Sequence, residues 1–237
     1  MAPIIIVTQI QKLLKEIISD WKKFLNESDD YKKQFYLSRH RGWVSKNNNK
    51  VQYFYFHRDY RARLEAAGID YSKYVTMIMN LEKLYQFSID ASLDIAKLLD
   101  KRLAGRGIKD MIKKCNAKNT SKHVLALSYY EKNKEQFVLS PRYQRSAWTF
   151  CLYQNSPGLY LGTDVDIRYE KQKNKILFIC GAKFERLVPG SINMVRSAFF
   201  CEKQNDHFFI DFSAEFFSAE KFVTDYITEK ERQQGFI

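Results

Sequence analysis

The chain contains few of the residues that dominate disordered or loop-rich proteins, with only 9 Gly and 4 Pro among 237 residues. It also lacks closely paired cysteines, so neither a disulfide framework nor a zinc ribbon is expected. Isolated cysteines of this kind are typical of free thiols in a reducing compartment. We therefore predict a cytoplasmic protein, with signal-peptide-independent secretion into a host left open; the four cysteines are Cys115, Cys151, Cys180 and Cys201.

Other absences narrow the function. No apolar run reaches the length of about 18 residues that a membrane-spanning helix needs. Walker, GxGxxG, GxSxG, HExxH and EF-hand spacings are all missing, which disfavours the common nucleotide-binding and hydrolase classes. We expect no metal site and no cofactor, and nothing in the sequence indicates an oligomeric state.

The residues that are present predict a folded α+β protein. Aromatic residues make up 15% of the chain, enough for a substantial core. Helical spacing of apolar residues comes first and period-two alternation comes later, which favours α+β over an alternating α/β fold. Helices are predicted at 8–26, 59–67, 71–87, 89–104 and 107–117, and strands at 123–130, 148–153, 164–169, 176–182 and 207–212, followed by a closing helix at 213–230.

A β-hairpin is predicted inside the helical part. Two β-prone runs, 42–45 and 51–56, flank a cluster of asparagines that tolerates left-handed turn geometry. The switch in periodicity near residue 118 suggests a basic, mainly helical region at 1–118 and a β-rich α+β region at 119–237. The two regions could also form one continuous domain.

The net charge of +12 is unevenly distributed. Residues 1–118 carry 23 Lys and Arg against 13 Asp and Glu, and between residues 32 and 63 nine basic residues face the single acid Asp59. A field this lopsided attracts polyanions. The partner expected is therefore nucleic acid or another polyanion.

Aromatic residues interleave with these cations, as they do in many nucleic-acid-binding surfaces, where cations contact phosphates and rings stack on bases. The alternative is an ordinary solvated basic surface over packed aromatic residues. The predicted nucleic-acid-binding residues are Lys32, Lys33, Arg39, Arg41, Trp43, Lys46, Lys50, Arg58, Arg61 and Arg63.

A rival reading places an enzyme site in the β-rich half. Asp164, Asp166 and Lys183 resemble, in order, the acids and lysine of PD-(D/E)xK nucleases on a predicted hairpin spanning 164–183. Such nucleases use two carboxylates to bind Mg²⁺, the only cofactor that this alternative implies. Gly181 stands where the second acid is needed, which argues against the nuclease.

The same segment also contains a C-x5-R spacing from Cys180 to Arg186. Cysteine phosphatases combine a thiolate with an arginine in this way. Here Glu185 lies inside the loop and would repel a phosphate. A phosphatase or transferase is therefore a second form of the enzyme alternative.

Nucleic-acid binding through 32–63 is the function that the sequence favours. A motif-poor enzyme in the β-rich half is the first alternative. An adaptor or effector that docks on acidic proteins or an anionic membrane is the second. The residues leave open whether the chain is an enzyme.

Overall fold

The computed structural model describes residues 4–6, 10–103, 105–116, 122–132, 136–156, 158–162, 167–169, 175–189, 196–201, 205–216 and 220–233. Its helices are α1 (Gln11–Leu25), α2 (Asp29–Lys33), α3 (Tyr60–Ala66), α4 (Val75–Arg102), α5 (Ile108–Cys115), α6 (Ala182–Leu187) and α7 (Glu220–Gln233). Its strands are β1 (Ile4–Ile6), β2 (Tyr36–Ser38), β3 (Arg41–Lys46), β4 (Val51–Phe56), β5 (Val124–Tyr130), β6 (Gln136–Tyr143), β7 (Trp148–Gln154), β8 (Leu159–Gly162), β9 (Ile167–Arg168), β10 (Lys175–Cys180), β11 (Arg196–Cys201) and β12 (His207–Ala214).

The described strands form two antiparallel sheets. The larger has eight strands in the order β1-β10-β7-β12-β5-β4-β3-β2, and the smaller has four in the order β6-β11-β8-β9. From β5 onward, β5, β7, β10 and β12 belong to the larger sheet while β6, β8, β9 and β11 belong to the smaller one. This is the connectivity of a double-sheet jelly roll, in which two sheets face each other across an interior.

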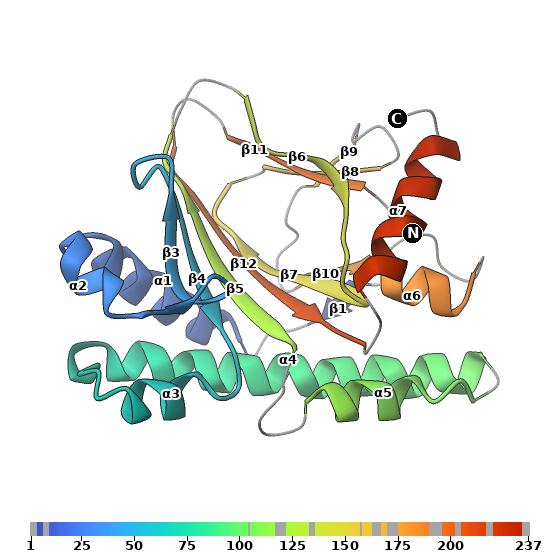
Figure 1. Cartoon of the computed structure of the whole chain (residues 1–237), viewed down its shortest axis with the longest axis horizontal. Coiled ribbons are helices and arrows are strands. Elements are labelled where there is room, and N and C mark those ends of the chain that lie inside the picture. The colour runs from blue at the N-terminus through green and yellow to red at the C-terminus, as the bar shows by residue number, and fades with distance from the viewer. Residues whose placement is uncertain are drawn as a thin grey trace.

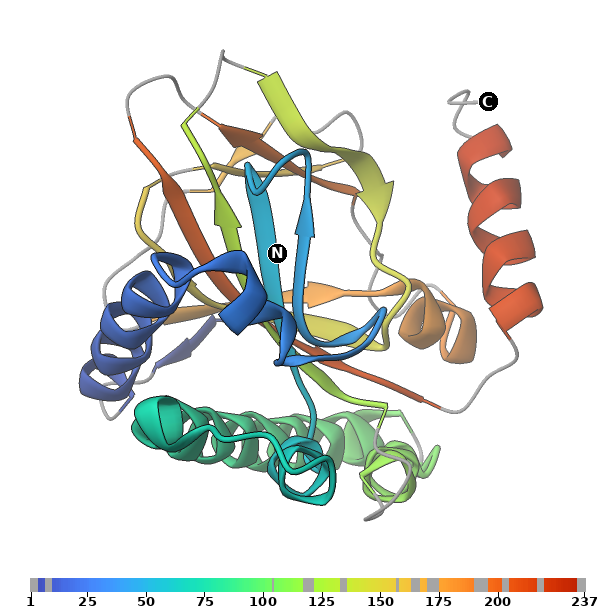
Figure 2. The same cartoon turned by 60° about the vertical axis from the view of Figure 1, so that its left-hand side comes forward.

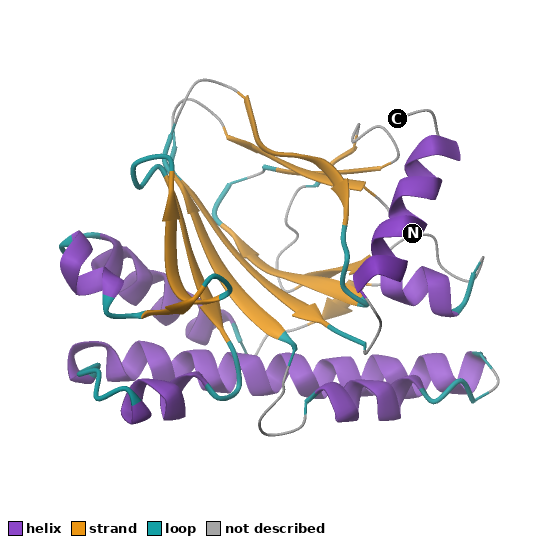
Figure 3. Cartoon of the chain, viewed as in Figure 1, coloured by secondary structure: helices purple, strands orange, loops and turns teal. Residues whose placement is uncertain are grey.

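Helices cover the outer face of the larger sheet, and the smaller sheet lies over its other face (Figure 1). The long helix α4 runs along the sheet with α1 beside it, and Figure 3 shows the helices and sheets as separate layers. Apolar residues at helical spacing turn one side of α1 inward, including Trp21 and Phe24. Their rings meet Phe54 of β4 at centroid distances of 5.9 and 5.7 Å.

The predicted hairpin is present as β3 and β4, joined by a turn in which three consecutive asparagines have positive φ. Asparagine tolerates this left-handed conformation better than other non-glycine residues. The turn extends beyond the large sheet toward the smaller one (Figure 2). The hairpin therefore forms one side of the space between the sheets.

The α+β class, with a helical first half, an antiparallel sheet and a closing helix, is confirmed. The predicted helices 71–87 and 89–104 are one helix, α4, within which Ser88 is buried and donates its hydroxyl to the Leu84 carbonyl at 2.8 Å. The predicted closing helix at 213–230 begins too early. Ser213 still belongs to β12, where it pairs with Thr149 of β7. The helix runs from Glu220 to Gln233.

The predicted hairpin over 164–183 is wrong. β9 pairs with β8 in the smaller sheet, whereas β10 lies between β1 and β7 in the larger one. The division near residue 118 stays a prediction, and β4 and β5 from either side of it are hydrogen-bonded neighbours. No described helix is both long enough and apolar enough to cross a membrane.

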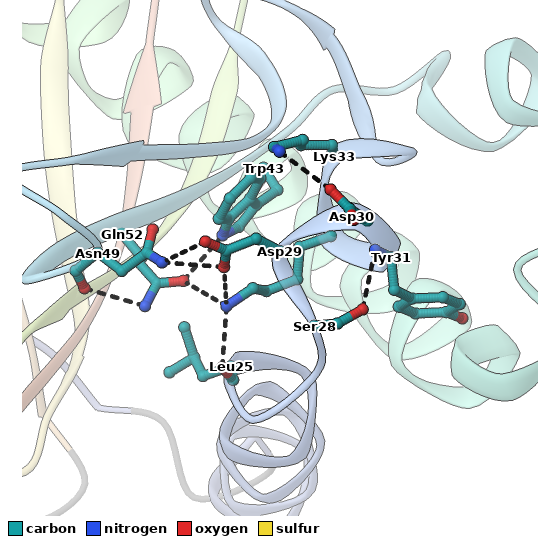
Figure 4. A network of polar contacts seen from close by, with 10 residues as sticks. Leu25, Ser28, Asp29, Asp30, Tyr31, Lys33, Trp43, Asn49 and Gln52 are labelled. Atoms are coloured by element: carbon teal, nitrogen blue, oxygen red, sulfur yellow. Dashed lines mark hydrogen bonds and ion pairs between the residues drawn. The ribbon is translucent and has the colours of Figure 1, made fainter.

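A buried lysine links α2 to the hairpin. Lys32 is only 3% exposed, and its ammonium donates to the Leu25 carbonyl at 3.1 Å and pairs with Asp29 at 3.1 Å. Gln52 accepts from the same ammonium at 3.5 Å and from the Trp43 indole at 3.0 Å. Figure 4 shows the polar network around these residues. A buried charge is tolerated here because several acceptors surround it.

Replacing Lys32 by Ala is expected to lower the free energy of unfolding by about 2–4 kcal/mol, because it removes a buried stem and leaves buried acceptors unpaired. Lys33→Ala is the matched control, since the neighbouring ammonium pairs with Asp30 at 3.0 Å on the surface. That variant should change stability by less than about 0.5 kcal/mol. Urea unfolding followed by circular dichroism measures both. Equal effects of the two substitutions would contradict the buried network.

Candidate ligand-binding site

A cavity of about 670 Å³ lies between the two sheets. Its walls come from the inner face of the larger sheet, from the end of β6, and from the loop and turn of the hairpin. Aromatic and apolar side chains share the wall with polar and charged ones, which include Arg145, Glu215 and Glu231. The lining includes Tyr53, Tyr55, Ser128, Tyr130, Arg142, Gln144, Thr149, Leu159, Ile179, Phe209, Asp211 and Ser213.

The alternation of side chains along a strand places these residues in the cavity. In β4, Phe54 and Phe56 point toward the helices and are fully buried, whereas Tyr53 and Tyr55 line the cavity. In β12, Phe212 points toward the helices while its neighbour Asp211 lines the cavity. Each strand therefore contributes one face to the core and the other to the candidate site.

Tyrosines form one wall of the cavity. The rings of Tyr53 and Tyr55 stack at a centroid distance of 5.5 Å and an angle of 13°. Tyr130 from β5 meets Tyr53 edge-on at 6.0 Å, and their hydroxyls share a hydrogen bond. Burial raises the pKa of all three phenols, so each stays neutral and can donate a hydrogen bond at physiological pH.

Asp211 is a half-buried carboxyl in the cavity wall. Burial between the sheets raises the pKa of its carboxyl to about 7, and the positive charge of Arg142 opposes that rise. Asp211 comes from the larger sheet and Arg142 from the smaller one. Among the residues that the structure describes, no hydrogen-bond partner is found for either side chain. Both are therefore available to a bound molecule.

Arg39, His40 and Lys46 stand at the rim. Arg39 and His40 come from the loop after β2, and Lys46 comes from the end of β3. The Lys46 ammonium lies 5.6 Å from the centroid of the Tyr53 ring, and the His40 ring lies 6.0 Å from that of Tyr55. A cation close to an aromatic face is attracted by the ring's quadrupole. The rim is therefore a positively charged approach to an aromatic interior.

Most of the other predicted nucleic-acid-binding residues make contacts within the protein. Lys32 and Trp43 are buried, and both contact the Gln52 side chain. Arg41 and Arg63 both pair with Asp59, at 2.8 and 2.6 Å. These three charges tie β3 to the start of α3.

The remaining cations of the set are dispersed over different elements. Arg58 donates to the Asn116 carbonyl at 2.5 Å, and Arg61 pairs with Glu82 of α4 at 3.2 Å. Lys33 pairs with Asp30 on α2, and Lys50 is exposed at the start of β4. The charge excess that the sequence shows is therefore largely used in joining the hairpin and helices, and Arg39 and Lys46 face the cavity instead.

The structure separates the predicted catalytic residues. Cys180 ends β10 and is buried, and burial, with the negative charge of Glu185, raises the pKa of its thiol to about 12. Lys183 is buried on α6 and forms an ion pair with Glu215. Arg186 is exposed on α6. A thiol with a raised pKa is a poor nucleophile, so this arrangement does not favour a phosphatase.

The two remaining candidates, Asp164 and Asp166, lie outside the described residues. Gly181 has a structural reason to be glycine, since a Cβ built there would lie 2.1 Å from the Ser146 carbonyl oxygen. No carboxylate fits at that position. The close approach of backbones at Gly181 explains the missing acid of the nuclease-like pattern.

Solved structures match this fold over most of the chain. A putative oxygenase from Shewanella oneidensis matches with a TM-score of 0.72 at 14% identity, covering 99% of this chain and 91% of its own. JOX2, crystallised with 2OG, Fe and JA, matches with a TM-score of 0.67 at 15% identity. That alignment covers 87% of this chain, which spans 64% of the length of JOX2.

AtDAO1, a dioxygenase for auxin oxidation from Arabidopsis thaliana solved with 2-oxoglutarate, gives a TM-score of 0.66 at 11% identity over 87% of this chain and 79% of its own. No protein-family model and no curated protein matches the sequence. The chain has the fold of oxygenases.

This likeness corrects the functional prediction. The sequence predicted that residues 32–63 bind DNA, another nucleic acid or a polyanionic partner. This prediction is wrong, because the structural neighbours are oxygenases and most of the basic residues have structural contacts. The nuclease, phosphatase and transferase alternatives name a different type of enzyme from these neighbours, and the adaptor alternative is corrected on the same ground. The expectation of no cofactor is corrected as well, because JOX2 was crystallised with iron and 2OG and AtDAO1 with 2-oxoglutarate.

The positions of the four histidines show whether this chain could hold an iron ion as non-haem oxygenases do. Non-haem iron(II) oxygenases typically hold the metal with two histidines and one carboxylate. His123 is buried, its Nε2 contacts the Ile112 carbonyl at 3.2 Å, and its Nδ1 accepts from the Glu215 amide at 2.9 Å. Burial lowers the pKa of this imidazole to about 4. Both of its nitrogens are therefore committed.

The other histidines are also placed apart from a shared centre. His57 is buried, with its Nε2 2.8 Å from the His40 carbonyl, and the Nδ1 of buried His207 lies 2.9 Å from the Ser156 hydroxyl. Only His40 lines the cavity. In the described part of the chain no three His, Cys, Asp or Glu side chains are grouped to hold a metal. The residues do not fit a two-histidine, one-carboxylate iron centre.

The sequence reasoning missed Asp211, Arg142, Tyr130 and the cavity role of Tyr53 and Tyr55. One signal was available: Asp211 is the only acid in the predicted strand 207–212, on the face opposite Phe212. Burying a charge inside an otherwise apolar strand costs folding free energy unless the charge is paired with another group of the protein or with a ligand. The partners of Asp211 come from β4, β5 and β6, and only the fold brings them together.

Asp211→Asn is expected to stabilise the protein above neutral pH. Because the folded pKa is raised above the usual value of about 3.9, folding retains a proton that the unfolded chain releases, and stability falls as pH rises from about 4 to about 7. Asparagine removes this dependence. At pH 8 the variant should be about 1–3 kcal/mol more stable than wild type, with water in the cavity reducing the effect, and at pH 5 the two should be similar.

Thermal unfolding at pH 5, 6.5 and 8 provides the measurement. Asp225→Asn on the exposed side of α7 is the matched control and should not alter the pH dependence. A lower melting temperature for Asp211→Asn at pH 8 would show that the ionised carboxylate is satisfied within the protein.

Proposed function

We propose that this chain binds a small organic acid in the cavity between its two sheets. The observation that carries the proposal is Arg142, a cation that lines the cavity beside the tyrosine wall and for which no hydrogen-bond partner is found among the described residues. Ligand sites are typically apolar cavities of about 300–1,000 Å³ with a few convergent polar groups. The volume of the cavity between the sheets, about 670 Å³, lies in this range, and its lining combines a tyrosine wall with polar groups.

The fold supports the same class of ligand. AtDAO1, which shares the fold, was solved with 2-oxoglutarate, a small dicarboxylate. In this chain Arg142 is placed to bind a carboxylate with two parallel hydrogen bonds, and the rim cations Arg39 and Lys46 attract anions toward the opening. The tyrosine wall then provides the apolar contact for the rest of the molecule. An intracellular location, where such acids are abundant, stays a prediction.

The direct test is titration of the purified chain with 2-oxoglutarate and with phenylpyruvate, followed by calorimetry and thermal shift. At least one of the acids is expected to bind and raise the melting temperature, as any ligand that prefers the folded state does. Arg142→Met should weaken that binding about 10- to 100-fold, because a charge-assisted hydrogen bond contributes about 1.5–3 kcal/mol. Added Fe(II) should leave the affinity unchanged.

Arg106→Met is the control for general electrostatics, since it removes the same charge from an exposed loop. It should bind as wild type does. Absence of binding for both acids, or full affinity in Arg142→Met, would refute the proposal.

A further inference from the structure

Asp211 poses a question that anion binding alone does not answer. A cavity built only for a carboxylate has no use for a carboxyl in its wall, since the two would repel. Asp211 nevertheless lies in β12, at the centre of the larger sheet, paired with Ala126 and Cys151 on the neighbouring strands. Neither of those side chains is a strong hydrogen-bond donor. A donor for this carboxyl must therefore come from within the cavity.

We propose that the ligand carries an ammonium group beside its carboxylate, that is, that the cavity binds an amino acid, with Asp211 as the acceptor for the ammonium. The inference rests on the proposed function and makes its ligand class specific. Arg142 binds the carboxylate from the smaller sheet, and Asp211 binds the ammonium from the larger one. Among the described residues the two side chains make no ion pair with each other, so a zwitterion placed between them satisfies both.

The surroundings of the two charges fit the rest of such a ligand. The stacked faces of Tyr53 and Tyr55, together with Phe209, offer an apolar surface next to Asp211. Two other charged groups of the lining have partners within the protein, because Glu215 pairs with Lys183 and Arg145 donates to the Thr224 hydroxyl. The cavity volume of about 670 Å³ leaves room for the side chain of any amino acid.

Binding of an ammonium should make the affinity depend on pH. The groups that face Asp211 are Tyr53 and Tyr55 from β4, Tyr130 from β5, Cys151 from β7 and Arg142 from β6. The three phenols have raised pKa values and stay neutral from pH 6 to 8. The carboxyl of Asp211, whose pKa is about 7, changes charge in this range. An ammonium binds the ionised form, so affinity rises from pH 6 to pH 8.

Pairs of acids that share a carbon skeleton test the inference. L-glutamate is compared with 2-oxoglutarate, and L-phenylalanine with phenylpyruvate, by calorimetry at pH 6 and pH 8. In at least one pair the wild type is expected to prefer the amino acid by about tenfold or more at pH 8, and by less at pH 6. Asp211→Asn should lose both the preference and its pH dependence, while it still binds the oxo acid.

Asp225→Asn serves as the control and should keep the wild-type preference. Circular dichroism and the melting temperature show whether Asp211→Asn is folded. If the oxo acids bind as well as their amino acids, or if Asp211→Asn keeps the preference, the inference fails while the proposed function stands. If no acid of either kind binds, both fail.

Discussion

The two faces of the larger sheet have different environments, a packed helical layer on one side and a cavity on the other. The rest of the structure depends on this difference. On one face the sheet packs against α1 and α4, where the side chains are closely fitted and mostly apolar, and a polar one such as Gln52 is hydrogen-bonded. On the other face it encloses a cavity with the smaller sheet, where polar side chains are allowed because the space is open to ligand or water. Successive residues of a strand point to opposite faces, so each inner strand serves both purposes residue by residue. The step from Phe212 to Asp211 in β12 shows how abrupt that change is.

This division also explains the basic character of the first half. Charged contacts hold the hairpin and its neighbouring helices together: Asp59 pairs with two arginines, and Lys32 of α2 contacts Gln52 of β4. Such residues cluster in sequence because the elements that they join are neighbours in sequence. A local excess of cations can therefore arise from tertiary packing, and it became a misleading indication of nucleic-acid binding. Charge counts describe the field of a chain but not which charges are already neutralised.

Local patterns predicted much of the fold. Residue spacing and turn residues were enough to predict several elements. They are the hairpin with its left-handed asparagine turn, the helix α1 and the strands β5, β7, β10 and β12. The strands β6, β8 and β11 of the smaller sheet were not predicted, because they are short or mixed in polarity and pair with strands distant in sequence. The same non-local pairing made 164–183 look like a hairpin when its strands belong to different sheets. A site assembled from β4, β5, β6 and β12 has no local signature either, and only the isolated acid Asp211 could have drawn attention to it.

The four histidines show how a fold and a chemistry can be separated. In this chain His123 uses both ring nitrogens on backbone groups, while His57 and His207 contact a carbonyl and a hydroxyl away from the cavity lining. These three histidines lie at the ends of β4, β5 and β12, outside the lining of the cavity that the same strands help to form. The cavity between the sheets is lined instead by other polar groups, among them a carboxyl and a guanidinium from opposite sheets. Fold similarity predicts where a molecule binds, but the identity of the polar groups determines which molecule is held and what happens to it.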